Sequence, residues 1–296
     1  MANVITRGTN LPTQIVEEMF NAVVGESALA KLSAQRPIPF NGTTEMVFTL
    51  DKEADIVGEN DAKSNGGGVA APKVIRPVKF EYGLRVSDEF LYGSEEYRMD
   101  ILRTFAEGAA KKFARGFDIA AMHGLNPRTG TASTVVGTNN LDAQIPNANK
   151  ITYAAATADA NIDAAIAKID TVGATANGIA IAPAMRSALA AMKADGAPLY
   201  REFSFGAHPE TLGAMTLAVN GTVATGDVAL AYVGDFSAFR WGYAKEIPLE
   251  VIEYGNPDND AQAGDLKGHN QVYLRAEAYI GWGILAPTWF ASVVGE

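Results

Sequence analysis

Cysteine is absent from this 296-residue chain, and histidine occurs only three times, as His123, His208 and His269. The lack of cysteine excludes disulfide bonds and thiolate metal sites, and it suits a protein made in a reducing cytoplasm. The three histidines are far apart in the sequence, so they form no local pair of metal ligands. We therefore expect no metal centre, and stability must come from packing or from partner chains.

Long apolar runs and an excess of positive charge are also missing. No stretch reaches the roughly 18 apolar residues of a membrane helix, and the start, MANVITRGTN, lacks the basic and apolar regions of a signal peptide. These absences predict that the protein is neither inserted into a membrane nor secreted. The 24 basic and 34 acidic residues give a formal charge of -10, which disfavours general attraction to nucleic acid because phosphate neutralisation drives such binding. A 48% share of hydrophobic residues is enough for one large domain or two smaller ones.

Two strand patterns flank a glycine-rich stretch, NDAKSNGGGVAAPKVIRP. Before it, residues 43–50 place Met46, Phe48 and Leu50 on one face of a strand. After it, apolar and polar residues alternate strictly from 78 to 86, which is the period of a half-buried strand. The two runs predict a long β-hairpin with its tip at the glycines.

Charge and length indicate that this hairpin needs a partner surface. Residues 45–61 carry six acids against one base, and residues 63–85 carry five bases against one acid, so opposite charges are expected to face each other across the strands. Each limb has some twenty residues, and at about 3.3 Å per residue the hairpin could reach roughly 60 Å. A lone two-stranded hairpin is marginally stable in water, so we expect a neighbouring subunit to cover its apolar face. The alternative is an ordinary β-sandwich in which the glycines form a plain loop.

The strongest helix signal lies between Ser94, a suitable cap, and Gly124, a suitable stop. Apolar residues recur there every four positions, and the helix would be about 45 Å long at about 1.5 Å per residue. Further elements are expected as follows: a helix over 15–24, a helix over 157–169, a strand at 178–182, a helix from Pro183 to Met192 closed by Gly196, and strands at 215–219, 228–234, 248–254 and 271–285.

Motifs that carry chemistry are few and weak. GWGILA at 281–286 matches G-x-G-x-x-A, but its surroundings are typical of a strand and Pro287 follows at once, which argues against a dinucleotide site. DNDAQAGD at 258–265 resembles a calcium loop, yet its glycine is at the seventh position and no glutamate closes the twelfth. No pair of carboxylates stands out as a glycosidase pair. We assign no catalytic, cofactor-binding or metal-binding residue, and a carbohydrate-acting enzyme is the remote alternative.

The order of these elements resembles a phage major capsid protein of the Hong Kong 97 type. ADIVGEN and VKFEYGLRVSDEFL are similar to the family's extension loop and to the start of its spine helix. VGDFSAFRW at 233–241 falls where the family has its peripheral and axial segments, and NQVYLRAEAYIGWGILAPTWFASVV resembles the family's final strand and tail. Each phrase alone is weak, and their order supplies most of the specificity.

The resemblance implies a subunit without catalysis and without a cofactor, packed as hexamers and pentamers into an icosahedral head around double-stranded DNA. It places the protein in the virion, made in the host bacterial cytoplasm and away from membranes. It implies an α+β fold of the Hong Kong 97 capsid type with these parts: an N-terminal arm (1–39), an extension loop formed by the β-hairpin (40–90), a P domain (91–200) with a spine helix (94–123), an A domain (201–270), and a return strand and tail of the P domain (271–296).

Under this resemblance the chief partner is the chain itself, with a portal protein, separate scaffolding and decoration proteins as further partners. Met1 lies eleven residues before the start of the arm helix, so scaffolding is expected to be separate, absent or already trimmed. An encapsulin, a cellular compartment of the same fold, is the alternative. The candidate intersubunit contacts lie at and beside the hairpin tip: Glu59, Asp61, Lys63, Gly66, Gly67, Gly68, Lys73 and Arg76.

Overall fold

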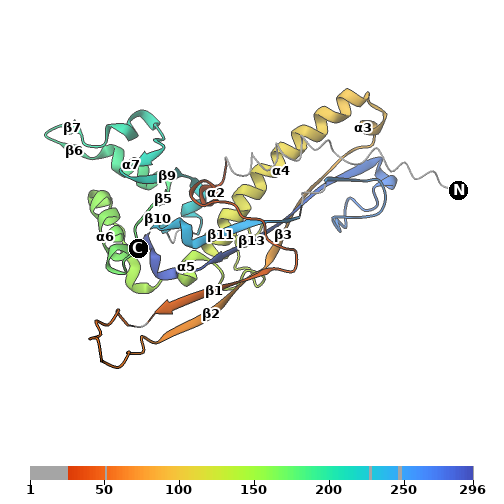
Figure 1. Cartoon of the computed structure of the whole chain (residues 1–296). Coiled ribbons are helices and arrows are strands. Elements are labelled where there is room, and N and C mark those ends of the chain that lie inside the picture. Colours follow the sequence, from red (N-terminus) through yellow and green to blue (C-terminus); the bar gives the residue numbers. More distant parts are fainter. Residues whose placement is uncertain (1–25, 51, 227–228, 246–248, 296) are drawn as a thin grey trace.

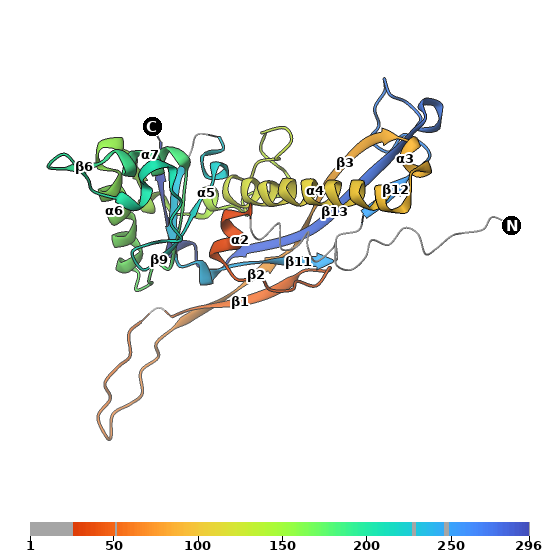
Figure 2. The same ribbon diagram turned by 90° about the horizontal axis from the view of Figure 1, so that it is seen from above.

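The structure is a computed structural model that describes residues 26–50, 52–226, 229–245 and 249–295. The helix expected over 15–24 lies outside the described residues. Figures 1 and 2 show an elongated molecule: a long helix runs beside a long sheet, a second α/β layer lies at one end, and a hairpin projects from the body. The mixture of helices and antiparallel and parallel strands confirms the expected α+β class.

The long helix is α4 (Glu95–His123), and its ends follow the sequence signals. The Ser94 side chain accepts a hydrogen bond from the backbone N–H of Tyr97, and Gly124 ends the helix in the left-handed conformation at φ 69°. Two glutamates lie in the first turn and a histidine in the last, the charge order that the helix dipole favours. The predicted helix is confirmed, including both of its caps.

A four-stranded antiparallel sheet packs along α4, with the last long strand at its centre. β13 pairs with β3 on one side over the whole length of β3, and with β11 and β12 on the other. The strands are β3 (Pro77–Ser87), β11 (Phe239–Lys245), β12 (Leu249–Ile252) and β13 (Gln271–Ile284), and a short helix α3 (Glu89–Tyr92) joins β3 to α4.

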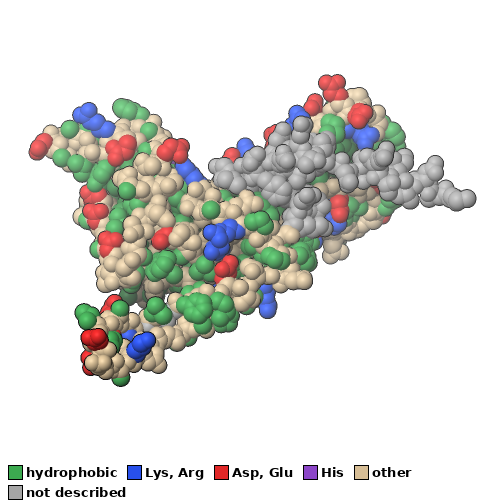
Figure 3. All heavy atoms as spheres, in the orientation of Figure 1, with side chains coloured by type: hydrophobic (Ala, Val, Ile, Leu, Met, Phe, Trp, Pro, Cys, Tyr) green, Lys and Arg blue, Asp and Glu red, His purple; other side chains and the backbone are tan. Residues whose placement is uncertain are grey.

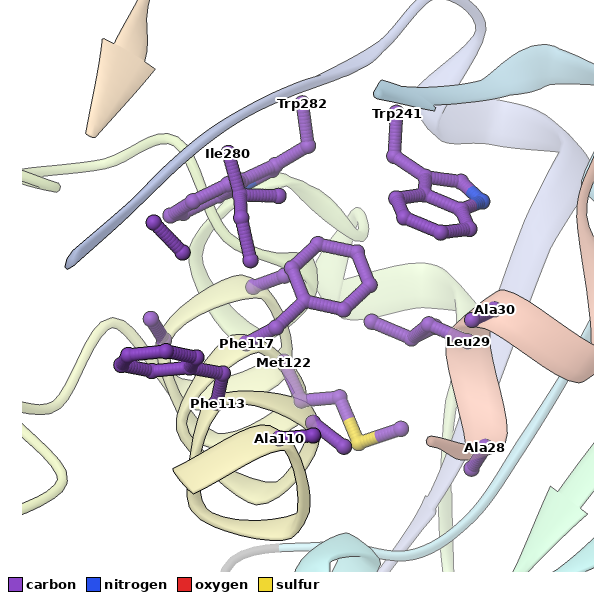
Figure 4. Packing of buried hydrophobic residues seen from close by; sticks show 14 of the residues in the cluster. Ala28, Leu29, Ala30, Ala110, Phe113, Phe117, Met122, Trp241, Ile280 and Trp282 are labelled. Atoms are coloured by element: carbon purple, nitrogen blue, oxygen red, sulfur yellow. The ribbon is translucent and has the colours of Figure 1, made fainter. Parts of the chain in front are cut away.

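The main core fills the space between this sheet and the second half of α4. Phe117 is fully buried, with ring centroids 5.2 Å from Trp241 and 5.8 Å from Trp282. Leu29 of α2 (Ala28–Leu32) closes the same cluster from the side, as Figure 4 shows. The first half of α4 is mostly exposed, and Phe105 and Ala106 are its buried residues.

A six-stranded mixed sheet forms the second layer, and α6 and α7 pack on it over a separate core. Two of its pairings are parallel, β5 with β9 and β14 with β4. In spatial order the strands are β4 (Lys150–Thr152), β14 (Phe290–Val294), β10 (Ala229–Gly234), β5 (Gly178–Ile181), β9 (Met215–Val219) and β8 (Thr211–Leu212); the helices are α6 (Ala158–Thr171) and α7 (Pro183–Ala191), with a short α5 (Leu141–Gln144) beneath α4.

The glycine expected to close the third helix has a different role. α7 ends at Ala191, and Gly196 lies in the turn of a small hairpin, β6 (Lys193–Ala194) and β7 (Ala197–Pro198). Asp195 and Gly196 have φ values of 50° and 82°, and two-residue hairpin turns of type I′ require positive φ at both central residues. The Asp-Gly pair is therefore a hairpin signal that the helix prediction overlooked.

The projecting hairpin has a shorter ladder and a different second strand than the sequence predicts. β1 (Thr43–Leu50) pairs with β2 (Gly68–Ile75), whereas residues 78–86 belong to β3 and pair with β13. The prediction of a direct pairing between 43–50 and 78–86 is wrong. The alternation of apolar and polar residues shows that one face of a strand is buried, but it does not show which strand is its partner. In the structure, residues 78–86 pair with β13 rather than with residues 43–50, and α4 packs on their apolar side.

The sheets divide the chain at other points than the predicted domain boundaries. Elements before residue 200, such as α6 and β5, share a sheet and a core with β9 and β10, which follow it. β11 and β12, expected in the A domain, pair with β13 instead. The chain passes more than once between the two sheets, so no single cut separates them. The division into a P domain and an A domain stays a prediction.

Candidate assembly surfaces

One face of the hairpin is apolar and uncovered. We call it the open face; it consists of Thr44, Met46, Phe48 and Leu50 on β1, opposite Val74, Pro72, Ala70 and Gly68 on β2. Phe48 is 72% exposed and Leu50 is 79% exposed. Figure 3 shows hydrophobic side chains gathered along the hairpin, with charged ones at its tip. No described part of this chain packs on the open face, although aliphatic and aromatic side chains gain most when they leave water.

The root of the hairpin, in contrast, is anchored in the body by close packing. Ile75 is only 1% exposed and lies over Gly281 and Gly283 of β13. A Cβ atom on Gly283 would approach Cγ1 of Ile75 to 2.7 Å, so only glycine fits there without a shift. The GWGILA sequence is thus explained by close approach of a side chain, and its glycines belong to a strand rather than to a nucleotide loop.

Polar contacts hold the same root. The carboxylate of Glu45 lies 3.6 Å from the guanidinium of Arg240 on β11. The backbone N–H groups of Arg36 and Ile38 donate to the carbonyl oxygens of β11 residues Trp241 and Tyr243, at 2.9 and 3.3 Å. These contacts fix the direction in which the hairpin leaves the body. The sequence showed none of them, because each joins segments about 200 residues apart.

The candidate contact residues all lie on the hairpin or at its root, as the sequence predicts, but their charges do not pair as expected. Only Glu45 and Lys73 stand directly opposite each other in the ladder, and the other charges lie in the irregular tip beyond it. In the tip, the backbone N–H groups of Gly58 and Asp61 bond within a turn, and Gly67 adopts φ 69°. Glu59, Asp61, Lys63, Gly66, Gly67, Gly68 and Arg76 are exposed, and Lys73 is half-buried.

A groove runs between α4 and β3 and is hollow in two adjoining parts. The first part, about 570 Å³, is lined by the exposed half of α4 and by the apolar face of β3, including Leu84, Tyr97 and Ile101. The second part, about 690 Å³, lies beside the second half of α4 and the loop that follows it. Tyr82 and Lys112 line both parts, so the two hollows adjoin each other.

The two parts of the groove differ in charge. The first contains one acid, Asp100, and one base, Lys112. The second contains one acid and four bases: Glu81, Lys79, Lys112, Arg115 and Arg128. Lys79 is paired with Glu277 at 2.6 Å, whereas the described residues offer no ion-pair partner to the other three bases. The groove is thus apolar at one end and basic at the other.

The sequence that resembles a calcium loop folds around an arginine. The Arg85 guanidinium donates to the carboxylate of Asp258, to the side chains of Asn256 and Gln271, and to the carbonyl oxygens of Ala263 and Gly264. Oxygen atoms surround the positively charged guanidinium as they would surround a metal ion. Hydrogen bonding from Arg85 lowers the pKa of Asp258 to about 2. The loop is therefore held by its own chain.

A buried carboxylate joins the long helix to two other segments, and no sequence pattern predicts this contact. Asp118 accepts hydrogen bonds from the backbone N–H groups of Ala28 and Leu29 at the start of α2, and from the hydroxyls of Ser27 and Thr222. Burial raises the pKa of Asp118, and these four donors oppose that shift. A single aspartate in a helical pattern is typical of an exposed position, so its role depends on tertiary contacts.

Within the described residues, no helix combines the length and the apolar character needed to cross a membrane. In the same part of the chain, no group of three or more histidine, aspartate or glutamate side chains is arranged to hold a metal ion. What the molecule offers are surfaces: an open apolar face, a charged tip and a long groove. Surfaces of this kind suit assembly with other chains.

A family model decides between the alternatives. The model described as the phage capsid family matches residues 8–294. This chain belongs to the phage capsid family. The match covers nearly the whole chain, and the expected Hong Kong 97 type of fold is confirmed by solved structures of the same shape.

Two of these solved structures share appreciable sequence with this capsid protein. One, from Mycobacterium phage Ogopogo, is 31% identical, with a TM-score of 0.77 and 92% of each chain covered. Another, from Gordonia phage Cozz, is 26% identical, with a TM-score of 0.75 and coverage of 92% of this chain and 87% of that one. The capsid of a native GTA particle shows the same fold at 15% identity and a TM-score of 0.63, covering 100% of this chain and 94% of that one.

The protein is therefore a major capsid protein, a structural component of a phage head. A search of curated proteins finds no match. The comparisons do not favour the encapsulin or the carbohydrate-acting enzyme.

Proposed function

We propose that the subunits assemble as hexamers and pentamers into an icosahedral head, and that each hairpin lies on a neighbouring subunit. The open face carries this proposal. It is apolar, it projects from the body, and nothing in the described part of its own chain covers it. A second copy is the partner that a capsid protein always meets.

The energy available from this face is substantial. Fully burying a side chain such as Phe48 or Leu50 contributes about 1.5–3 kcal/mol, and the open face has several apolar side chains. Because each subunit both gives a hairpin and receives one, the contact is heterologous, and such contacts close into rings when the rotation allows it. The packed root then fixes the direction in which the hairpin leaves the body. The irregular tip can change its conformation to fit neighbours that lie at different angles.

We further propose that the head encloses double-stranded DNA without sequence-specific binding, and that a portal protein and separate scaffolding or decoration proteins complete it. The net charge of -10 supports a container that does not hold DNA tightly, because its average field repels phosphate. Synthesis in the cytoplasm of a bacterial host goes with this proposal, and the lack of cysteine is compatible with it.

The test compares assembly of the purified wild-type protein with that of a Phe48→Ser, Leu50→Ser variant, by electron microscopy and sedimentation. We expect closed, uniform particles from the wild type and unassembled subunits from the variant. Val172→Ser is the matched control, because Val172 is also exposed but lies at the end of α6, away from the hairpin. Particles of normal size from the double variant would contradict the role of the open face. A wild type that never forms particles under any solution condition would contradict the assembly proposal itself.

A further inference from the structure

Four asparagines in this chain are each followed by glycine, and such a pair has a chemistry of its own. The backbone nitrogen of the glycine can attack the side-chain amide carbon of the asparagine, because glycine has no Cβ atom that shields the nitrogen. The attack closes a cyclic imide, a succinimide, and releases ammonia. The four pairs are Asn41–Gly42, Asn65–Gly66, Asn177–Gly178 and Asn220–Gly221.

Two of these asparagines are held by hydrogen bonds at both ends of the side chain. The amide nitrogen of Asn177 donates to the carboxylate of Asp235 at 2.6 Å, and that of Asn220 donates to the carbonyl oxygen of Glu26 at 2.9 Å. The side-chain oxygen of each accepts a backbone N–H, at 2.8 and 3.1 Å. Both side chains would have to break these bonds before they could react.

The pair at the root of the hairpin is held through its glycine. The N–H of Gly42 donates to the carbonyl oxygen of Pro39 at 2.8 Å. A Cβ atom on Gly42 would approach the carbonyl oxygen of Ile75 to 2.6 Å, so the turn is also closely packed. The nitrogen that would attack Asn41 is therefore engaged in another contact.

The pair at the tip, Asn65–Gly66, is open. Both residues are exposed and lie in the irregular stretch between the end of β1 and the start of β2, which Figure 2 shows projecting from the body. Among the described residues, none accepts a hydrogen bond from the N–H of Gly66, and a Cβ atom there would meet nothing within 4 Å. Exposed loop tips of this kind move most easily into reactive conformations.

Two contacts at the same pair favour the attack. The N–H of Gly67 donates to the side-chain oxygen of Asn65 at 3.0 Å, and this oxygen takes the negative charge when the nitrogen adds. The ammonium of Lys52 lies 3.4 Å from the backbone carbonyl oxygen of Asn65. A positive charge at that oxygen stabilises the peptide nitrogen of Gly66 after it has lost its proton.

We propose that Asn65–Gly66 is a self-modification site of the unassembled subunit. The Gly66 nitrogen forms a bond to Cγ of Asn65, the bond from Cγ to Nδ2 breaks, and Nδ2 leaves as ammonia with the former amide proton of Gly66. Water then opens the succinimide at either carbonyl and gives aspartate or isoaspartate. In sum one water is consumed and one ammonia is released, so the reaction needs no enzyme, oxidant or reductant.

The products change the tip in charge and in length. Both add a carboxylate beside the acids Glu59 and Asp61, and isoaspartate also inserts a methylene group into the backbone. The consequence for assembly rests on the proposed function, in which a neighbouring subunit covers the hairpin. Conversion then proceeds in free subunits, slows in particles, and leaves altered subunits that join particles poorly.

The first experiment follows the four asparagines in unassembled wild-type subunits at neutral pH, by mass spectrometry of peptides sampled over time. We expect Asn65 to convert at least about tenfold faster than the other three, a barrier difference of about 1.4 kcal/mol. In urea the four rates should become similar, because every pair is then exposed. Equal rates in the folded subunit, or an unchanged ranking in urea, would overturn the proposal.

Variants separate the two causes. Gly66→Ala shields the attacking nitrogen, and the site tolerates alanine because Gly66 has no positive φ and open space around it; we expect conversion of Asn65 to slow at least about tenfold. Lys52→Gln should give a smaller slowing. Lys63→Gln is its matched control, because it removes a positive charge from the tip but not the one beside Asn65. An unchanged rate in Gly66→Ala would overturn the mechanism, and equal rates in the two lysine variants would overturn the role of Lys52.

The last experiment tests the link to assembly. Aged and fresh subunits are mixed, particles are formed, and the fraction of converted Asn65 is compared between particles and leftover subunits. We expect particles to be depleted of converted chains, and Asn65→Gln subunits to keep full assembly after ageing. Equal fractions would overturn the link to assembly while the proposed function stands. A failure to form any particles would count against the proposed function, and the rates in free subunits would still decide the modification.

Discussion

The hairpin and the body use the same kinds of side chain in opposite ways. In the body, Phe117 and Trp282 are fully buried between α4 and the sheet. On the hairpin, Phe48 and Leu50 are mostly exposed, although they lie on a regular strand with a regular partner. The body completes its core within one chain, whereas the hairpin leaves half of a contact to be completed by another.

The boundary between the two regions is sharp. Ile75 is buried against β13, and Val74, the preceding residue, is 54% exposed on the open face. Within a few residues the chain passes from the packed core to the exposed open face. A subunit built this way can be stable before assembly and still gain energy from it, because the two processes bury different side chains.

The largest effect on the subunit is expected from the centre of the body. Phe117→Ala removes the ring that contacts Trp241 and Trp282, and we expect the free energy of unfolding to fall by about 3–5 kcal/mol. Urea denaturation of unassembled subunits measures this loss. A loss below about 1 kcal/mol would show that the cluster is not the main core, since even modest core truncations usually cost more.

The next effect concerns the root, where the two regions meet. Gly283→Val forces a side chain against Ile75, and overpacking of this kind costs about 1–3 kcal/mol. Gly66→Val is the matched control, because a Cβ atom on Gly66 meets nothing within 4 Å. We expect its unfolding free energy to stay within about 0.5 kcal/mol of the wild type. Equal losses for both variants would remove the distinction between root and tip.

A smaller effect is expected on the open face itself. Phe48→Ala changes little that is buried in the isolated subunit, so its free energy of unfolding should change by less than about 0.5 kcal/mol. The same urea denaturation measures it. A loss as large as that of Phe117→Ala would mean that the hairpin folds back on its own chain, and the comparison between hairpin and body would fail.

The smallest effect is a local pH dependence at the far end of the body. Hydrogen bonding from Arg85 lowers the pKa of Asp258 to about 2, below the ordinary aspartate value. The contact therefore stabilises the 255–270 loop fully at pH values above the ordinary pKa of aspartate. This stabilisation is lost as the pH falls toward about 2 and the Asp258 carboxylate takes up a proton. An NMR titration of the Asp258 carboxyl carbon should give a midpoint near 2 in the wild type. In an Arg85→Gln variant the midpoint should return to the ordinary range, and an unchanged midpoint would exclude Arg85 as the cause.

The sequence predicted the elements that depend on local patterns. Three of these elements are present: the helix between Ser94 and Gly124, with its two caps, the strand with an apolar face at residues 43–50, and the long final strand. The resemblance in the order of elements predicted the family. Alternation could not show that residues 78–86 pair with β13 rather than with β1, because both partners suit the same pattern.

The rest depends on contacts between distant segments. Gly281 and Gly283 look like a nucleotide motif in the sequence, and only the position of Ile75 explains them. Arg85 fills a loop that sequence alone compares with calcium sites. The groove residues of α4 carried no signal, because isolated bases on a helix are typical of a solvated face. The hairpin tip was recognisable, since glycines and charges between two strands mark it directly.

The most direct test of an open face covered by a neighbour is hydroxyl-radical footprinting of Met46 and Phe48, because oxidation of a side chain follows its exposure to solvent. The experiment compares unassembled subunits with closed particles, with Tyr254 as an exposed reference on the body. The account predicts rapid oxidation of both residues in subunits and strong protection in particles. Equal oxidation in the two states, with particles present, would contradict it.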